Sequence, residues 1–246
     1  MNHIPKRLRK EPLIEAIWQV QFDNPGAGEA LPGLLYAMLR KDHPNIQLYR
    51  LPTADIPVSV AQLDPVLRLA AKIRLVEPGG IYFWQVGDRV VTLNCRKPYA
   101  GWAKFSDAIK GLTRIIEDSG LVPQPQRHSL RYIDLLTLDE APDISAIQLD
   151  MKIGAYTVQK HPLQLRLELQ NNGVIHVVQI ATPAQVQLPE GPQNGSVIDL
   201  ETFINAQPAN WDDVRKQIDV LHDHSKGLFF EQLLTKQAIE KLDPED

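Results

Sequence analysis

The chain has 246 residues, of which 43% are hydrophobic and 23% are charged. These are ordinary values for a folded globular protein, and they exclude a disordered chain. The formal net charge is −4, whereas a nucleic-acid-binding domain usually carries a basic excess. No apolar run approaches the roughly 18 residues of a membrane-spanning helix. We therefore expect a protein that does not span a membrane, and nucleic-acid binding is disfavoured. The single cysteine, Cys95, indicates a reducing, cytoplasmic compartment.

The chain is predicted to begin with a strand and a helix. Residues 12–22 alternate apolar and polar side chains with a period of two, which is typical of a strand with one wet face. Leucines and a methionine then recur at helical spacing. They predict a helix from about residue 30 to 41, with Pro32 in its first turn and a stop at His43-Pro44.

Residues 46–96 are predicted to form several strands. Two of them, at 81–86 and 89–96, flank Gly87-Asp88, which can supply the positive φ of a tight hairpin turn. Helical spacing then predicts a helix from near Trp102 to a stop at Gly120. Another of the predicted strands contains the alternating apolar residues Leu67, Leu69, Ala71, Ile73 and Leu75.

The second half repeats this order of elements. Residues 127–139 have a strand pattern, and Asn172-Gly173 is a strong hairpin signal between a leucine-rich strand and a return strand at 174–181. Pro183 to Gly195 is predicted to be a polar loop. Later elements are a strand from Val197 to Asn205, a long helix from Trp211 to about Leu234, and a short final helix capped by Thr235.

Strands that cluster in hairpins, rather than alternating with helices, predict the α+β class. We expect a largely antiparallel, curved sheet with helices packed on one face. The predicted order of elements, β-α-βββ-α, occurs twice. In the second half, the sequence does not decide whether the first helix, a short one, is present. We therefore expect a single domain over 1–246, with two structural halves at 1–122 and 123–246 as a possible duplication.

Cysteine and histidine spacing excludes the common metal and redox sites. Cys95 is the only cysteine, so the chain has no intrachain disulfide and no multi-cysteine zinc site. His222 and His224 lie about 200° apart on the predicted helix and cannot bind one ion by themselves, so a solvated helix face is expected. The sequence also contains no glycine-rich phosphate loop and no nucleophile elbow. We expect no metal and no cofactor.

Two polar residues on apolar strand faces are the weak candidates for a catalytic role. Alternation puts His176 on the apolar face of a hairpin, where a hydrogen-bonded histidine at the rim of the core is favoured over a ligand or catalytic role. Asp134 lies between Tyr132 and Leu136 on the apolar face of its strand. A buried carboxylate is costly unless it is paired, so a structural ion pair or a bulge is favoured over a general acid or base.

One basic cluster precedes the first strand. A solvated lead segment is the favoured interpretation, and an arm that contacts phosphates is the alternative. The cluster consists of Lys6, Arg7, Arg9 and Lys10.

Several loose, mostly apolar segments together resemble a sporadically distributed family of uncharacterised bacterial proteins. The segments are Pro12 to Phe22, Tyr82 to Asn94 with Tyr99, Trp102 and Phe105 after it, Leu130 to Asp134, Val197 to Leu200, Leu221 to His224, Leu228 to Phe230, and Leu234-Thr235. The family pattern tends to have Asn at the position of Asp134. Its patchy occurrence resembles that of mobile-element, toxin–antitoxin and phage-defence genes.

Three function hypotheses remain open. The preferred one is a non-enzymatic protein that binds a protein partner, as an accessory, antitoxin or immunity subunit, with a homo-oligomer as a possibility. The alternative is a module that binds a small molecule or nucleotide between the sheet and the long helix, with hydrolysis through His176 or Asp134 as an option. Nucleic-acid binding through the N-terminal basic cluster ranks third.

Overall fold

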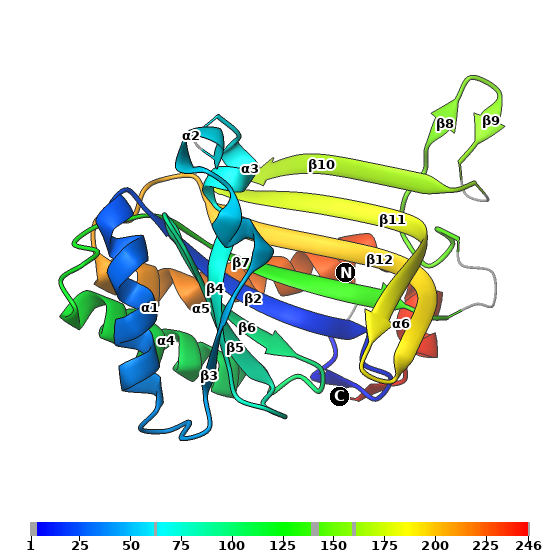
Figure 1. The fold of residues 1–246 in the computed structure, drawn as a ribbon. Coiled ribbons are helices and arrows are strands. Elements are labelled where there is room, and N and C mark those ends of the chain that lie inside the picture. Colours follow the sequence, from blue (N-terminus) through cyan, green and yellow to red (C-terminus); the bar gives the residue numbers. More distant parts are fainter. Residues whose placement is uncertain (1–3, 62, 139–142, 159–160, 246) are drawn as a thin grey trace. The chain divides into compact units, whose positions relative to one another are not determined.

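The computed structural model describes residues 4–61, 63–138, 143–158 and 161–245. Its main feature is an open antiparallel sheet of nine strands in the order β10-β11-β12-β7-β2-β6-β5-β4-β3 (Figure 1). Helices accompany this sheet, which confirms the predicted α+β class. Among the described residues, no helix is both long enough and apolar enough to cross a membrane.

The elements have the following bounds. The strands of the large sheet are β2 (Leu13–Phe22), β3 (Gln47–Arg50), β4 (Ala71–Val76), β5 (Tyr82–Gly87), β6 (Val90–Arg96), β7 (Pro125–Leu136), β10 (Leu163–Asn171), β11 (Val174–Leu188) and β12 (Gly191–Ile204). Two short pairs are β1 (Arg7–Leu8) with β13 (Pro244–Glu245), and β8 (Lys152–Ile153) with β9 (Tyr156–Thr157). The helices are α1 (Pro25–Leu39), η1 (Pro52–Asp55), α2 (Val58–Ala61), α3 (Pro65–Arg68), α4 (Trp102–Asp118), α5 (Trp211–Gly227), η2 (Leu228–Leu233) and α6 (Lys236–Lys241).

The chain divides into two compact units. Unit 1 comprises Met1–Ile14, Arg131–Thr202 and Leu221–Asp246, and unit 2 comprises Glu15–Leu130 and Phe203–Val220. The core of unit 1 is a cluster of buried residues from β7, β11, β12, η2 and α6. In unit 2 the buried face of β2 includes Ala16, Trp18, Val20 and Phe22, as its period-two pattern predicts.

The strand order is the same in the two sequence halves. In the first half, the first strand β2 is followed across the sheet by β6, β5 and β4. In the second half, the first strand β7 is followed by β12, β11 and β10. In each half, the strand that comes last in the sequence, β6 or β12, lies beside the strand that comes first, β2 or β7. A duplication predicts such an order, and the duplication itself stays a prediction.

The first helix begins earlier than predicted. α1 covers Pro25–Leu39 rather than 30–41. Pro25 occupies the first turn, where its missing N–H costs nothing, and Pro32 lies inside the helix instead of at its start. The Asn24-Pro25-Gly26 sequence ends the strand and starts the helix in one step, which the helical spacing of the leucines alone does not indicate.

The expected polar loop from Pro183 to Gly195 is instead a paired hairpin. β11 continues to Leu188, and β12 begins at Gly191. Exposed glutamines here alternate with the partly or fully buried residues Ala184, Val186 and Leu188. That is a strand pattern, which a proline and the high glutamine content obscure.

The segment from Leu67 to Leu75 is a short helix followed by a strand. Asp64 caps α3, because its side chain accepts hydrogen bonds from the N–H groups of Val66 and Leu67. β4 begins only at Ala71. The predicted alternation of apolar and polar residues therefore forms a strand only from Ala71 onward.

The β5–β6 hairpin forms as predicted, but its glycine has a different role. Gly87 does not have a positive φ. A Cβ atom there would lie 2.3 Å from the carbonyl oxygen of Ala70. The position therefore needs glycine because the backbone of the neighbouring strand approaches closely.

The long C-terminal helix forms as predicted and buries an apolar stripe. Trp211, Val214, Ile218, Leu221 and Leu228 are all buried. Thr235 caps α6 through its hydroxyl, which accepts from the N–H of Ala238 at 3.2 Å. This final helix therefore begins where its capping residue predicts.

Truncation of Leu221 to alanine tests the packing of this stripe. We expect Leu221→Ala to lower the free energy of unfolding by about 2–5 kcal/mol, because the side chain is fully buried. The neighbouring Val220 is 43% exposed, so Val220→Ala should cost no more than roughly 0.5 kcal/mol. Urea denaturation followed by circular dichroism measures both. Equal effects of the two substitutions would contradict the observed burial.

Candidate functional site

A pocket in unit 1 lies beside the turn of the β10–β11 hairpin. Its volume is about 550 Å³, which is within the range of small-molecule sites. The Asn172-Gly173 turn forms as predicted, with φ of 51° and 82°, and it pairs Leu169 with His176. The lining residues are Leu169, Gln170, Asn171, His176, Asp223, His224, Gly227, Leu228, Glu231 and Gln232.

The helix changes its winding where it lines the pocket. α5 ends at Gly227, and η2 is a π-helix in which the N–H of Leu234 donates to the carbonyl of Phe229, five residues back, at 3.0 Å. In an α-helix, residues four positions apart are rotated by about 40° more than one full turn around the helix axis, so a row of such residues winds slowly around the helix. A π-turn has more residues per turn, so it reverses part of this rotation and keeps the row on the same side. Two rows of residues spaced by four, 223–227–231 and 224–228–232, therefore stay along the pocket. Such turns are rare and frequently occur at functional sites.

His176 lies at the inner wall of the pocket, and a chain of hydroxyl groups holds it. The side chain is only 4% exposed, and its Nδ1 lies 2.8 Å from Oγ1 of Thr202. Oγ1 of Thr202 lies 2.8 Å from Oγ of Ser225, which in turn lies 2.8 Å from the carbonyl oxygen of Leu221. Thr202 and Ser225 are both buried, so these groups satisfy one another.

The hydroxyl of Ser225 is placed to donate to Oγ1 of Thr202 or to the carbonyl oxygen of Leu221, and its single proton serves one of them at a time. In the contact between Thr202 and Nδ1 of His176, the donor depends on the tautomer of the ring. In the tautomer with the proton on Nδ1, Nδ1–H donates to Thr202 and Nε2 is left as an acceptor, to which no residue of the described chain bonds.

Burial keeps this imidazole neutral. The pKa of His176 is lowered from 6.5 to about 4, first because the ring is desolvated and second because His224 lies nearby. The centroids of the two rings are 6.2 Å apart. At neutral pH, the ring is therefore uncharged.

The charged side chains of the pocket are both carboxylates. Asp223 and Glu231 line it, and the ten lining residues include no lysine or arginine. Among the described residues, no group of three or more histidine, cysteine, aspartate or glutamate side chains could hold a metal ion. With its two carboxylates and no lysine or arginine, the pocket lining has a negative formal charge.

Asp134 lies in a different environment of unit 1. It is 5% exposed, and its pKa is raised from 3.8 to about 8, mainly by desolvation and further by the charges of Glu11 and Asp199. Arg131 does not compensate it, because its guanidinium forms a bidentate pair with Asp199. Asp134 is therefore mostly a neutral carboxylic acid at pH 7. β12 separates its strand β7 from the strand of His176, so the two candidates do not form one site.

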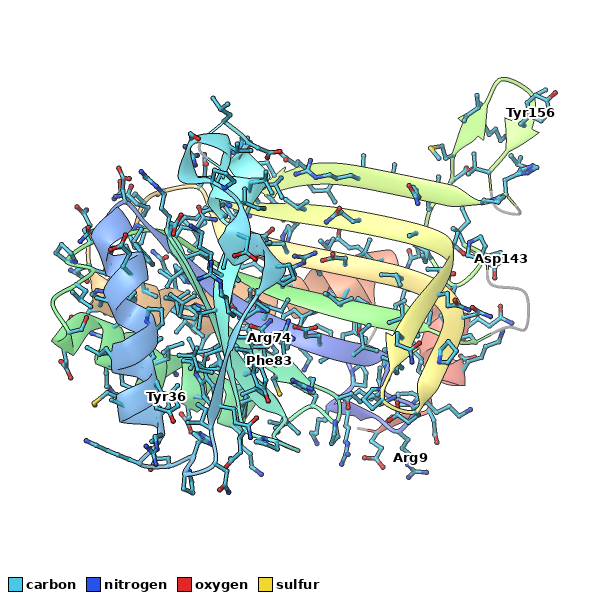
Figure 2. All side chains as sticks on the ribbon, in the orientation of Figure 1. Arg9, Tyr36, Arg74, Phe83, Asp143 and Tyr156 are labelled. Atoms are coloured by element: carbon cyan, nitrogen blue, oxygen red, sulfur yellow. The ribbon has the colours of Figure 1, made fainter. Side chains whose placement is uncertain are left out.

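The N-terminal basic cluster lies against the C-terminal segment. β1 pairs with β13, and Arg9 forms ion pairs with Asp243 and Glu245 (Figure 2). The N–H of Lys6 donates to the carbonyl of Glu245 at 3.0 Å. The four basic side chains are exposed, but the segment that carries them is a docked strand rather than a free arm.

The two helix histidines contact strands, which corrects the expectation of a solvated helix face. Nδ1 of His222 lies 2.9 Å from the hydroxyl of Tyr132, whereas His224 lines the pocket beside His176. Sequence analysis also missed Thr202, Ser225 and Glu231. The available signal was Ser225 itself, a small polar residue four positions after the buried Leu221.

The chain matches no protein-family model, and no curated protein matches it significantly. The function must therefore be argued from the geometry of the site.

The tautomer of His176 can be tested directly. We expect ¹⁵N NMR of the imidazole at pH 7 to show a protonated Nδ1, which donates to Thr202, and an unprotonated Nε2. Thr202→Val keeps the shape of the side chain and removes the hydroxyl, so the ring should shift toward the Nε2–H tautomer. A protonated Nε2 in the wild-type protein would contradict a free acceptor in the pocket.

The ionisation of Asp134 predicts an unusual dependence of stability on pH. Between about pH 4 and 8 the folded protein keeps a proton that the unfolded chain releases, so this carboxyl makes the fold less stable as pH rises. Asp134→Asn removes the ionisable group. We expect it to match the wild type near pH 4 and to raise Tm by roughly 5–15 °C at pH 8.

Thermal unfolding followed by circular dichroism at pH 4 to 9 measures this difference. Asp107→Asn, which changes an exposed carboxylate on α4, serves as the matched control and should leave Tm within about 2 °C of the wild type at every pH. A gain for Asp134→Asn that does not vary with pH would refute the buried neutral acid.

Proposed function

We propose that the protein binds a small organic cation, an alkylamine or alkylguanidine, in the pocket lined by β10, β11, α5 and η2. The observation that carries this proposal is the match between the polar groups of the pocket and a donor-only ligand. With the proton of His176 on Nδ1, the pocket has a buried neutral acceptor in Nε2, and it has two carboxylates in Asp223 and Glu231. Ammonium and guanidinium groups carry only hydrogen-bond donors.

The same groups disfavour a nucleotide or another anion. Phosphate sites use arginine, lysine or the N-terminus of a helix, and the pocket has neither basic residue. It also lies along the C-terminal turns of α5, where the helix dipole is negative. Within the small-molecule hypothesis, a cation is therefore favoured over a nucleotide.

Two leucines favour an alkyl portion in the ligand. Leu169 and Leu228 line the pocket together with the polar groups. Alkyl carbons can pack against them while the charged end contacts the carboxylates. A short alkylamine or alkylguanidine combines these two properties.

The chemistry of His176 supports binding rather than catalysis. A general base is most effective when its pKa lies near the working pH. The pKa of His176 is about 4, so at pH 7 the ring is a weak base and a good hydrogen-bond acceptor. This is consistent with the non-enzymatic role expected from the sequence.

Binding of another protein is the second candidate function. It is favoured by β10, which lies at one edge of the large sheet and carries the half-exposed Leu167 and Leu169. The more specific role as an accessory, antitoxin or immunity subunit stays a prediction, which rests on the family resemblance alone.

Calorimetric titration with putrescine, agmatine and AMP tests the proposed ligand class. We expect the two cations to bind and AMP not to bind. Asp223→Asn and Glu231→Gln should each weaken cation binding by about tenfold, because each removes one charged acceptor without changing its size. Affinity should also fall as pH falls toward 4, because protonation of His176 converts Nε2 into a donor and adds a positive charge.

Glu240→Gln is the control for these substitutions. Glu240 is an exposed carboxylate on α6 that does not line the pocket, so this variant should bind like the wild type. The proposal fails if AMP binds as well as the amines do, or if neither cation binds at about 10 mM. It also fails if the two pocket variants bind as tightly as the Glu240 control.

A further inference from the structure

The outer edge of β10 is long, regular and unprotected. β10 is the terminal strand of the large sheet, and all nine of its residues pair with β11 without a register shift (Figure 1). Proteins usually protect such edges with charged side chains, proline, bulges or very short strands. β10 has no proline, lysine or bulge, and its two charged residues, Arg166 and Glu168, have opposite signs, whereas the opposite edge strand, β3, has only four residues. An edge of this kind can accept another strand.

The hairpin turn determines which backbone groups of β10 face outward. Asn171 and Val174 flank a two-residue turn, and residues in that position form a hydrogen-bonded pair. Counting back from Asn171, every second residue of β10 uses its backbone N–H and C=O groups to bond to β11. The alternate residues, Gln164, Arg166, Glu168 and Gln170, direct their N–H and C=O groups to the outer edge.

We propose that a second copy of this chain occupies this edge, with the two β10 strands antiparallel around a two-fold axis at Leu167. The sequence of β10 is almost palindromic around that residue. The axis would place Arg166 opposite Glu168 of the partner subunit, and Gln164 opposite Gln170 of the partner subunit. Each pair forms twice by symmetry, as an isologous interface requires.

The outward-facing groups agree with this register. Residues 164, 166, 168 and 170 all point to the edge, and the axis pairs them only with one another. Every opposed pair of this set can therefore exchange two backbone hydrogen bonds. The leucines occupy the alternate positions, and all of them lie on one face of the joined sheet.

Charge selects this register over its neighbours. If the axis is moved by one residue, outward-facing backbone groups still oppose one another. A move to Arg166 places this residue opposite Arg166 of the partner subunit, and a move to Glu168 places that residue opposite Glu168 of the partner subunit. Like charges directly opposite each other destabilise a strand pair, whereas opposite charges stabilise it. In the single chain, Arg166 and Glu168 contact each other at 2.8 Å and are both exposed, so they remain accessible to a partner.

The apolar face of β10 supports the same pairing. Leu163 and Leu165 pack against the core of unit 1, but Leu167 and Leu169 are 40% and 38% exposed. The axis brings Leu167 against Leu167 of the partner subunit, and Leu169 against Leu165 of the partner subunit. Dimerisation therefore buries the two leucines that the single chain leaves partly in water. This inference does not rest on the ligand proposed for the pocket, and Leu169 and Gln170 belong both to the pocket lining and to the proposed interface.

Charge reversal at the edge tests the proposal. Sedimentation velocity should show a dimer for the wild type. Arg166→Glu or Glu168→Arg alone places like charges opposite each other and should raise the dimer dissociation constant by about tenfold or more. The double variant with both substitutions restores the opposite-charge pairs and should dimerise within about threefold of the wild type. Circular dichroism checks that every variant is folded.

Cysteine cross-linking tests the register. Leu167→Cys places two thiols opposite each other across the axis, so mild oxidation should give a disulfide-linked dimer. Leu165→Cys is the matched control and should not cross-link to itself, because residue 165 faces residue 169 of the partner subunit. The native Cys95 is buried and should not react.

Three outcomes would overturn the proposal. The first is a monomeric wild type at about 100 µM, a concentration that reveals even a weak dimer. The second is a dimer that both single charge reversals leave intact, since the interface would then lie elsewhere. The third is self-cross-linking of Leu165→Cys in place of Leu167→Cys, because that result requires another register.

Discussion

The buried contacts of His176 are the constraint on which the pocket depends. The hydroxyl of Ser225 can donate to the carbonyl of Leu221, four residues back in α5, or to Thr202. A serine that bonds to the carbonyl four residues back is a common local arrangement in helices. Thr202 in turn contacts Nδ1 of His176, so the ring on β11 is connected to the helix through two hydroxyl groups. With the proton on Nδ1, the tautomer on which the proposed ligand depends, Nε2 is left as the acceptor.

Burial makes this arrangement stable and sensitive at the same time. Ser225, Thr202 and His176 are all nearly inaccessible to water, so each depends on its neighbours for hydrogen bonds. Removing one group leaves another buried and unsatisfied, which costs more than a lost surface bond. The same burial lowers the pKa of His176. The environment that holds the ring in place is thus also the reason that it remains an acceptor at neutral pH.

Local sequence patterns predicted the elements better than they predicted the site. Asn172-Gly173 located the hairpin, because both residues tolerate positive φ. Alternation also placed His176 on the inner face of that hairpin. The pocket needs more information, because its walls come from segments about 60 residues apart in sequence, in β10 and in η2. The winding of η2 also has no simple residue signature, so the positions of Glu231 and Gln232 could not be read from helical spacing.

The two helix histidines show the limit of this reasoning clearly. Their separation on the helix predicts that they cannot bind one ion by themselves. The sequence could not indicate that each faces a different strand, with His222 against Tyr132 and His224 near His176. Such information depends on sheet order, and the order of β11, β12 and β7 is set by pairings between distant strands.

Asp134 shows how burial determines the charge of a side chain. Burial and the nearby carboxylates of Glu11 and Asp199 raise the pKa of Asp134 to about 8, so the side chain is mostly uncharged at neutral pH. A protonated carboxyl and an amide have nearly the same shape, and each can both donate and accept hydrogen bonds. The position therefore calls for a neutral polar side chain of this size, and Asp meets that requirement only by retaining its proton.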